Sequence, residues 1–224
     1  MPQRPTMILF DVNETLSDLS PLAECFAEVG ASPELAPLWF ASVLRDGFAL
    51  TAAGSQERFA TIAREVLVAL LPAASLDRSP EDAATYVLDA FSTLSVHPDV
   101  VDGIRALRAG GLRLATLTNG AREVAEGLLI RAGIRGEFDQ LLSVEEAGAW
   151  KPARAAYAYA CRMSEVAPDR AVLVAVHPWD IDGAARAGLR TAWLDRTGTH
   201  YPGYAVPPTW RASSLTELAE QLLR

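Results

Sequence analysis

The sequence predicts an α/β protein, in which helices flank a parallel sheet and a helical subdomain is inserted into the chain. From about residue 97 onward, short apolar runs alternate with helical stretches, as expected for a parallel sheet wound by crossover helices. One earlier apolar run, residues 7–10, is separated from this region by a long block without a convincing strand. We therefore expect a sheet core from residues 1–16 and 96–224, and a cap from residues 17–95.

The core elements follow from the spacing of apolar residues. Strands are expected at 7–10, 112–117, 140–143, 171–176 and 191–194. Helices are expected at 99–109, 121–132, 153–161 and 180–187, where apolar residues recur every three or four positions. Gly110, Gly133 and Gly188 lie where such helices should end, and residues 198–208 have the composition of a loop.

The inserted block is typical of a small helical bundle. Prolines interrupt it at positions 21, 33, 72 and 80. The segments 23–29, 37–50, 57–70 and 81–91 can each form a helix.

Composition limits the classes of partner. The 224 residues carry 20 basic and 28 acidic side chains, a formal net charge of −8, without a basic run, so we expect no nucleic-acid partner. Cys25 and Cys161 lack metal-binding spacing and are expected to be buried thiols in a reducing cytosol. Neither a signal peptide nor an apolar stretch of about 18 residues is apparent, so we expect a cytoplasmic protein without membrane contact.

Polar side chains follow the predicted strands where each apolar run ends. Asp11 follows the first strand, Thr118 and Asn119 the second, Lys151 the third and Asp180 the fourth. Singly, these residues could form a turn, an Asx turn, a solvated lysine and a helix N-cap. Together they predict a site, because the carboxyl ends of parallel strands meet at one edge of the sheet.

The residue types in this set suit covalent catalysis on an anionic substrate. The carboxylate of Asp11 can attack carbon or phosphorus if a nearby cation holds it, and Lys151 supplies that cation. Thr118 and Asn119 offer donors for an anionic group, while Asp180 can hold Lys151 or activate water.

Four segments resemble the motifs of the haloacid dehalogenase superfamily. They are Phe-Asp-Val-Asn-Glu-Thr-Leu at 10–16, Leu-Thr-Asn-Gly at 117–120, Lys-Pro at 151–152 and Asp-Ile-Asp-Gly-Ala at 180–184. The resemblance covers nearly the whole chain and implies a Rossmann-like core, a mobile cap and an aspartate nucleophile.

Two departures from that superfamily's phosphatases favour a reaction without metal. The phosphatases carry a second aspartate, a general acid, where this chain has Asn13, which cannot donate and recover a proton in the same way. Glu14 is expected to point elsewhere. A Gly-Asp pair that supplies a metal ligand is replaced by Ala175 and Val176, so we expect no cofactor, and magnesium only if the protein is a phosphatase.

Halide leaves carbon as a stable anion, which requires neither an acid nor a metal. Further segments resemble the L-2-haloacid dehalogenases: 38–39, 141–144, 151–152 with Tyr157, Trp179 with Asp180, and 193–198. This resemblance implies that Asp11 attacks the halogen-bearing carbon with inversion and that water hydrolyses the resulting ester. Thr15 and Lys151 would orient Asp11, Asp180 would help activate water, and residues 118–119 would bind the substrate carboxylate.

We expect further side chains to contact a small 2-halocarboxylate. They are Asn13, Phe40, Arg45, Tyr157, His177 and Trp179. Those dehalogenases carry arginine where this chain has Phe40 and asparagine where it has His177, and Arg45 is rotated by roughly 140° from position 40 on a helix. The site that binds the leaving halide in those dehalogenases is therefore rebuilt or absent in this chain.

His177 is open to several interpretations. It could cap the following helix, bind halide, bind a substrate carboxylate or act as a base. Trp39, Phe40, Trp150 and Trp179 could form a pocket around it or belong to the core.

A magnesium-dependent phosphatase and a catalytically silent binding protein remain alternative functions. The relatives imply a homodimer.

Overall fold

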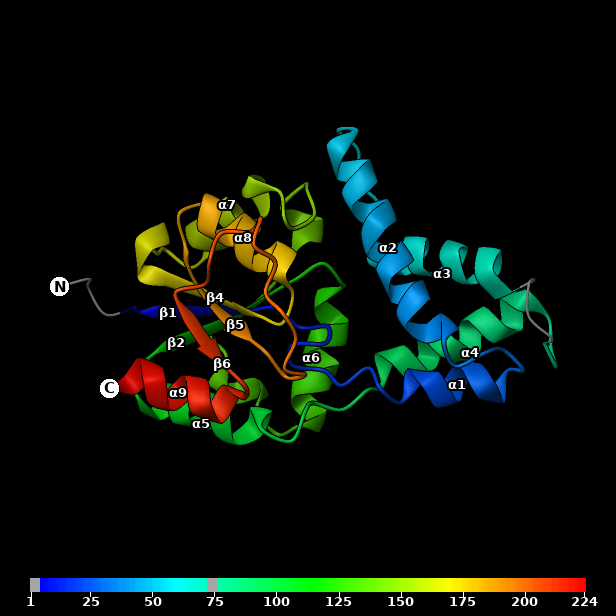
Figure 1. Cartoon of the computed structure of the whole chain (residues 1–224), viewed down its shortest axis with the longest axis horizontal. Helices are drawn as coiled ribbons and strands as arrows, with labels where there is room; N and C mark the ends of the chain where they lie inside the picture. Colours follow the sequence, from blue (N-terminus) through cyan, green and yellow to red (C-terminus); the bar gives the residue numbers. More distant parts are fainter. Residues whose placement is uncertain (1–4, 72–75) are drawn as a thin grey trace. The chain divides into compact units, whose positions relative to one another are not determined.

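The computed structural model describes residues 5–71 and 76–224 and confirms the predicted α/β fold (Figure 1). Within these residues, six strands form one parallel sheet in the order β3-β2-β1-β4-β5-β6. The strands are β1 Met7–Phe10, β2 Arg113–Thr118, β3 Gln140–Ser143, β4 Ala171–Ala175, β5 Arg190–Leu194 and β6 Trp210–Ala212. Sequence patterns did not indicate β6, because three residues are too few to show a strand period.

Helices cover both faces of the sheet. They are α5 Val100–Ala109, α6 Arg122–Arg131, α7 Arg154–Met163, α8 Pro178–Arg186 and α9 Leu215–Leu223, with short 3₁₀ turns η2 Arg135–Glu137, η3 Val144–Glu146 and η4 Pro168–Arg170. Figure 1 shows α5 and α9 on the opposite side of the sheet from α7 and α8. Ile8 and Phe10 of β1 are fully buried in one apolar cluster with residues of α5, α6 and α9. Gly133 and Gly188 follow α6 and α8 with φ of 67° and 95°, which glycine adopts at little cost.

The path of the chain places a switch point beside β1. The chain runs from β1 to β2 and β3 on one side, then crosses to β4 on the other side of β1. In open α/β sheets, ligands bind at the carboxyl ends of the strands where the order reverses. Asp11 directly follows β1 at that point, and Val176 and His177 follow β4.

Residues 18–94 form a second compact unit, separate from the unit formed by residues 1–17 and 95–224. Its helices are α1 Leu22–Glu28, α2 Leu35–Ala52, α3 Phe59–Leu70 and α4 Pro80–Ser92. Trp39 is fully buried at its centre, where it packs against Phe26, Phe40 and Phe91 and donates from Nε1 to Ala63 O at 3.0 Å. The interruption expected at Pro72 lies outside the described residues.

The two cysteines differ in burial. Cys161 on α7 is buried, as expected, whereas Cys25 on α1 is only half-buried, so the expectation of a second buried thiol was wrong. None of the helices in the described residues is both long enough and apolar enough to cross a membrane.

Candidate active site

Asp11 is held at the end of β1 by both its backbone and its side chain. Its N–H donates to Val174 O at 3.0 Å. Its Oδ1 accepts from Lys151 Nζ at 2.8 Å, and its Oδ2 accepts from Thr15 Oγ1 at 2.7 Å. Burial alone would raise the pKa of Asp11, but the Lys151 ammonium and His177 outweigh burial and hold that pKa well below its usual range. Asp11 is therefore an ionised, oriented carboxylate at neutral pH.

Lys151 bridges two carboxylates from a fully buried position. Its Nζ lies 2.8 Å from Asp11 Oδ1 and 2.6 Å from Asp180 Oδ2, and the lysine and Asp180 side chains are 0% exposed. Burial would lower the pKa of Lys151, but the two carboxylates raise it. Burial raises the pKa of Asp180, whose Oδ1 also accepts from Tyr157 OH at 2.6 Å. The structure thus brings the predicted Asp11, Lys151, Asp180 and Tyr157 together.

Thr15 transmits a backbone hydrogen bond to the carboxylate. Val176 N donates to Thr15 Oγ1 at 3.1 Å, and the same oxygen donates its proton to Asp11 Oδ2. The incoming amide fixes the direction of the hydroxyl, since that hydrogen must then point to the carboxylate. The backbone N–H of residue 176 makes this contact, and every residue type except proline has that N–H.

His177 faces Asp11 from the start of α8. It occupies the N-cap position, but within the described chain its side chain makes no cap hydrogen bond, so the helix-cap interpretation was wrong. Nδ1 lies 3.1 Å from Asp11 Oδ2, Nε2 lies 2.7 Å from Glu14 Oε2, and the ring stacks on Trp179 with centroids 5.0 Å apart. Burial would lower the pKa of His177, but hydrogen bonds to Asp11 and Glu14 raise it to about 9. A halide or a substrate carboxylate would have to displace one of these carboxylates to reach a ring nitrogen.

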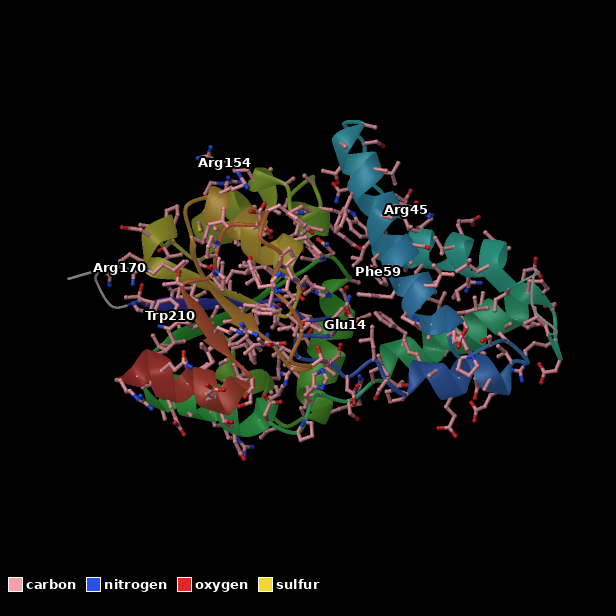
Figure 2. All side chains as sticks on the ribbon, viewed as in Figure 1. Glu14, Arg45, Phe59, Arg154, Arg170 and Trp210 are labelled. Atoms are coloured by element: carbon pink, nitrogen blue, oxygen red, sulfur yellow. The ribbon has the colours of Figure 1, made fainter. Side chains whose placement is uncertain are left out.

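Glu14 points into this cluster, contrary to the expectation that it points elsewhere; Figure 2 labels it. It is one of the non-glycine residues with positive φ, at 62°, a conformation that turns its side chain toward His177. The carbonyl of Glu14 pairs with His97 Nε2 at 3.0 Å, and the carbonyl of Thr15 accepts from Arg196 Nη2 at 2.9 Å. Sequence reasoning missed Glu14, His97 and Arg196, because their roles arise from backbone geometry that no motif records.

Thr118 and Asn119 are buried and already bonded. Thr118 Oγ1 accepts from Gly120 N at 2.9 Å, which is an ST turn made by the threonine rather than the Asx turn considered as the alternative interpretation. Asn119 Oδ1 accepts from Lys151 N at 2.9 Å, and its Nδ2 donates to Lys151 O at 3.3 Å. The Asn119 amide therefore fixes the backbone of Lys151. Binding of a substrate carboxylate by this pair stays a prediction, as does the role of Asn13, which is buried nearby.

Trp179 and Trp150 differ in burial. The Trp179 ring, half-buried at the start of α8, lies against His177, and its centroid is 5.9 Å from Lys151 Nζ. Trp150 is buried at 1% exposure.

Phe40 and Arg45 belong to helix α2 of the second unit. Phe40 is buried and packs against Trp39 and Phe59. Arg45 projects from α2 with 70% of its side chain exposed and pairs with Asp46 at 2.7 Å (Figure 2). It borders a groove of about 860 Å³ lined by residues from position 38 to 70. Their part in receiving a leaving group stays a prediction.

The donor set bears on metal binding. Among residues 5–71 and 76–224, no group of three or more His, Cys, Asp or Glu side chains is arranged to hold a metal ion. The positive charge between Asp11 and Asp180 comes from Lys151.

Comparison with known proteins gives consistent matches over most of the chain. Residues 6–188 match a family described as haloacid dehalogenase-like hydrolases. The (S)-2-haloacid dehalogenase 1 of Pseudomonas sp. strain CBS-3 is 32% identical over 219 residues, which cover 96% of each chain. Haloacetate dehalogenase H-2 of Moraxella sp. strain B is 28% identical, covering 89% of this chain and 92% of that protein. A crystal structure of a dehalogenase with an intermediate complex superposes with a TM-score of 0.92 at 26% identity, covering 100% of both chains.

Proposed function

The chain belongs to the haloacid dehalogenase-like hydrolases, and from this membership we propose that it displaces halide from a small 2-halocarboxylate without a metal. The observation that carries the proposal is the Asp11 carboxylate, kept ionised and aimed by Lys151 and Thr15 at the switch point of the sheet. Asn13 favours carbon over phosphorus, because its amide cannot protonate an ester oxygen, whereas halide departs as an anion without a proton.

The reaction proceeds through an ester on Asp11. An oxygen of Asp11 bonds to the substrate's second carbon while the carbon–halogen bond breaks, and halide leaves with the electron pair. Water then attacks the Asp11 carbonyl carbon, and the hydroxy acid departs. Asp180 is the candidate base for that water, because burial raises its pKa above that of an ordinary carboxylate. Lys151 binds both carboxylates and opposes the build-up of negative charge.

The proposal includes three wider features. Residues 17–95 act as a cap subdomain, as the family resemblance implies, and the protein works in the cytoplasm. A homodimer is the expected assembly, which sedimentation equilibrium tests directly.

Halide release tests the function. We expect release from chloroacetate or a 2-halopropionate in EDTA, loss of that release in Asp11→Asn, and transfer of ¹⁸O from labelled water into Asp11 in a single turnover. Magnesium-dependent cleavage of a phosphomonoester, lost in Asp11→Asn, would favour the phosphatase instead. The absence of both activities together with no mass shift on Asp11 would identify a silent binding protein.

A further inference from the structure

The two oxygens of Asp11 are not equivalent. Oδ2 has two partners, the Thr15 hydroxyl at 2.7 Å and His177 Nδ1 at 3.1 Å, whereas within the described chain Oδ1 has one, Lys151 Nζ at 2.8 Å. Each carboxylate oxygen offers about two lone-pair sites. Both sites of Oδ2 are therefore engaged, and Oδ1 keeps one with which to attack.

We propose that Oδ1 of Asp11 attacks the substrate, and that Oδ2 then becomes the oxyanion of ester hydrolysis, bound by the Thr15 hydroxyl and by His177 Nδ1–H. Glu14 is the residue that positions His177. This inference rests on the proposed dehalogenase function and assigns a role to the two residues, His177 and Glu14, that the family resemblance did not explain.

The second step balances around Oδ2. The water oxygen bonds to the Asp11 carbonyl carbon and gives one proton to Asp180, while the carbonyl electron pair moves onto Oδ2. As that pair returns, the bond between the carbonyl carbon and Oδ1 breaks, and Oδ1 leaves on the hydroxy acid with the proton from Asp180. Asp11 regains a carboxylate made of Oδ2 and the water oxygen. The second proton of the water molecule goes to solvent.

Both donors are held in place before the reaction. The Thr15 hydroxyl is directed by Val176 N at 3.1 Å. His177 is held by Glu14 at 2.7 Å on its other nitrogen and by stacking on Trp179. The distances of 2.7 and 3.1 Å to Oδ2 fall within the range of about 2.7–3.1 Å at which donors stabilise an oxyanion. Fixed donors of this kind need no reorganisation when charge develops on the oxygen.

Glu14 matters most after the first step. Two carboxylates, Asp11 and Glu14, face the imidazole, while Lys151 lies on the far oxygen of Asp11 and Asp180 is paired with that lysine. Ester formation neutralises Asp11, so Glu14 then becomes the carboxylate that keeps the imidazole protonated and oriented. Loss of Glu14 should therefore affect hydrolysis of the ester more than its formation.

Rapid-quench kinetics with 2-chloropropionate separate the two steps, because halide appears with the ester and hydroxy acid appears after it. We expect His177→Ala to slow ester hydrolysis by about 10²–10³-fold, the usual effect of removing one oxyanion donor. Halide should then appear in a burst whose amount equals the molar amount of enzyme, and intact mass spectrometry should show the ester. His177→Asn retains a neutral donor and should restore part of the rate.

The pH profile distinguishes a charged donor from a structural role. In the wild type, ester hydrolysis should slow as pH rises through the pKa of His177, because the ring then loses a proton. In Glu14→Gln this decline should occur at lower pH, and in His177→Asn it should disappear. The exposed residues His200 and Glu220 provide matched controls, and His200→Ala and Glu220→Gln should leave both steps unchanged.

The outcomes distinguish a failure of this inference from a failure of the proposed dehalogenase function. If the wild type gives neither halide nor ester with any tested substrate, both the function and the inference are wrong. If the wild type releases halide but His177→Ala and Glu14→Gln mainly slow ester formation, or slow both steps equally, only the inference is wrong. Should His177→Ala fail to fold, Glu14→Gln decides, since it keeps the imidazole and replaces the carboxylate with an amide of equal size.

Discussion

Replacing Lys151 by methionine tests how strongly one buried ammonium stabilises two carboxylates. Nζ lies 2.8 Å from Asp11 and 2.6 Å from Asp180, and the three side chains are 0–6% exposed. Solvent therefore screens none of these charges, and the cost of breaking a buried ion pair, about 3–5 kcal/mol, applies. In a chain of this length each kcal/mol lowers Tm by roughly 2–4 °C. We expect Lys151→Met to lower Tm at neutral pH by roughly 6–20 °C.

The loss should depend on pH in a defined direction. Lys151 lowers the pKa of Asp11, so its contribution to stability is present above the unfolded-state pKa of about 3.9 and is lost as pH falls through the folded-state value. In Lys151→Met that contribution is missing at neutral pH, where both carboxylates stay buried without a cation. On acidification they take up protons, so the Tm difference from the wild type should shrink.

Scanning calorimetry between roughly pH 4 and pH 8 measures this difference, with circular dichroism to confirm that the variant folds. Lys151→Arg is the matched control for charge. It keeps a cation but replaces a compact ammonium with a planar fork, and we expect it to restore less than half of the loss. A Tm difference that is equal at both ends of the pH range, or absent at neutral pH, would refute the reasoning.

Three further substitutions around the same cluster give separate expected outcomes. Tyr157→Phe removes the 2.6 Å hydrogen bond that lowers the pKa of Asp180, so the acidic limb of the pH–rate profile for ester hydrolysis should move to higher pH. Gly183→Ala brings a Cβ within 2.6 Å of Pro152 Cβ and 2.7 Å of the Tyr157 hydroxyl, and urea unfolding should show a loss of about 1–3 kcal/mol. Asn119→Ala leaves a buried backbone N–H without its acceptor, and we expect a loss of about 1–3 kcal/mol by the same measurement, with lower kcat.

The sequence predicted the sheet core well because its signals are local. Alternating apolar runs and helix-period stretches placed β1 to β5 and the helices between them within about two residues. The strand ends converge because parallel strands share an edge, which is why the sequence alone groups Asp11, Lys151 and Asp180. Two elements of the core were missed: β6, whose three residues include a half-buried Trp210 and gave too short a pattern to detect, and the helix α9 that follows it.

The inner details of the site were not predictable, because they depend on backbone geometry. Glu14 was expected to point elsewhere, since nothing in the motif indicates that its φ is 62°. That conformation is held by His97 and Arg196, which lie 83 and 181 residues from the carbonyls they bind. Asn119 was expected to bind substrate, but whether an amide faces a ligand or a neighbouring backbone depends on a contact 32 residues away.

The choice of cation beside Asp11 agrees with the geometry of the site. Lys151 is the only lysine in the chain, and the other 19 of its 20 basic residues are arginines. The chain therefore uses lysine only at the position between two buried carboxylates. An ammonium is a compact point charge with three rotatable donors, and it can reach Asp11 and Asp180 at once without matching a plane. A guanidinium needs more room and presents its donors in a fixed fork. Protein labelled with ¹⁵N-lysine should therefore show a single Nζ resonance, and because the two carboxylates raise the pKa of Lys151, that resonance should stay in the ammonium form above the ordinary lysine pKa of about 10.4. Titration at or below that value would mean that the two carboxylates do not hold the proton, and the bridging arrangement would then be wrong.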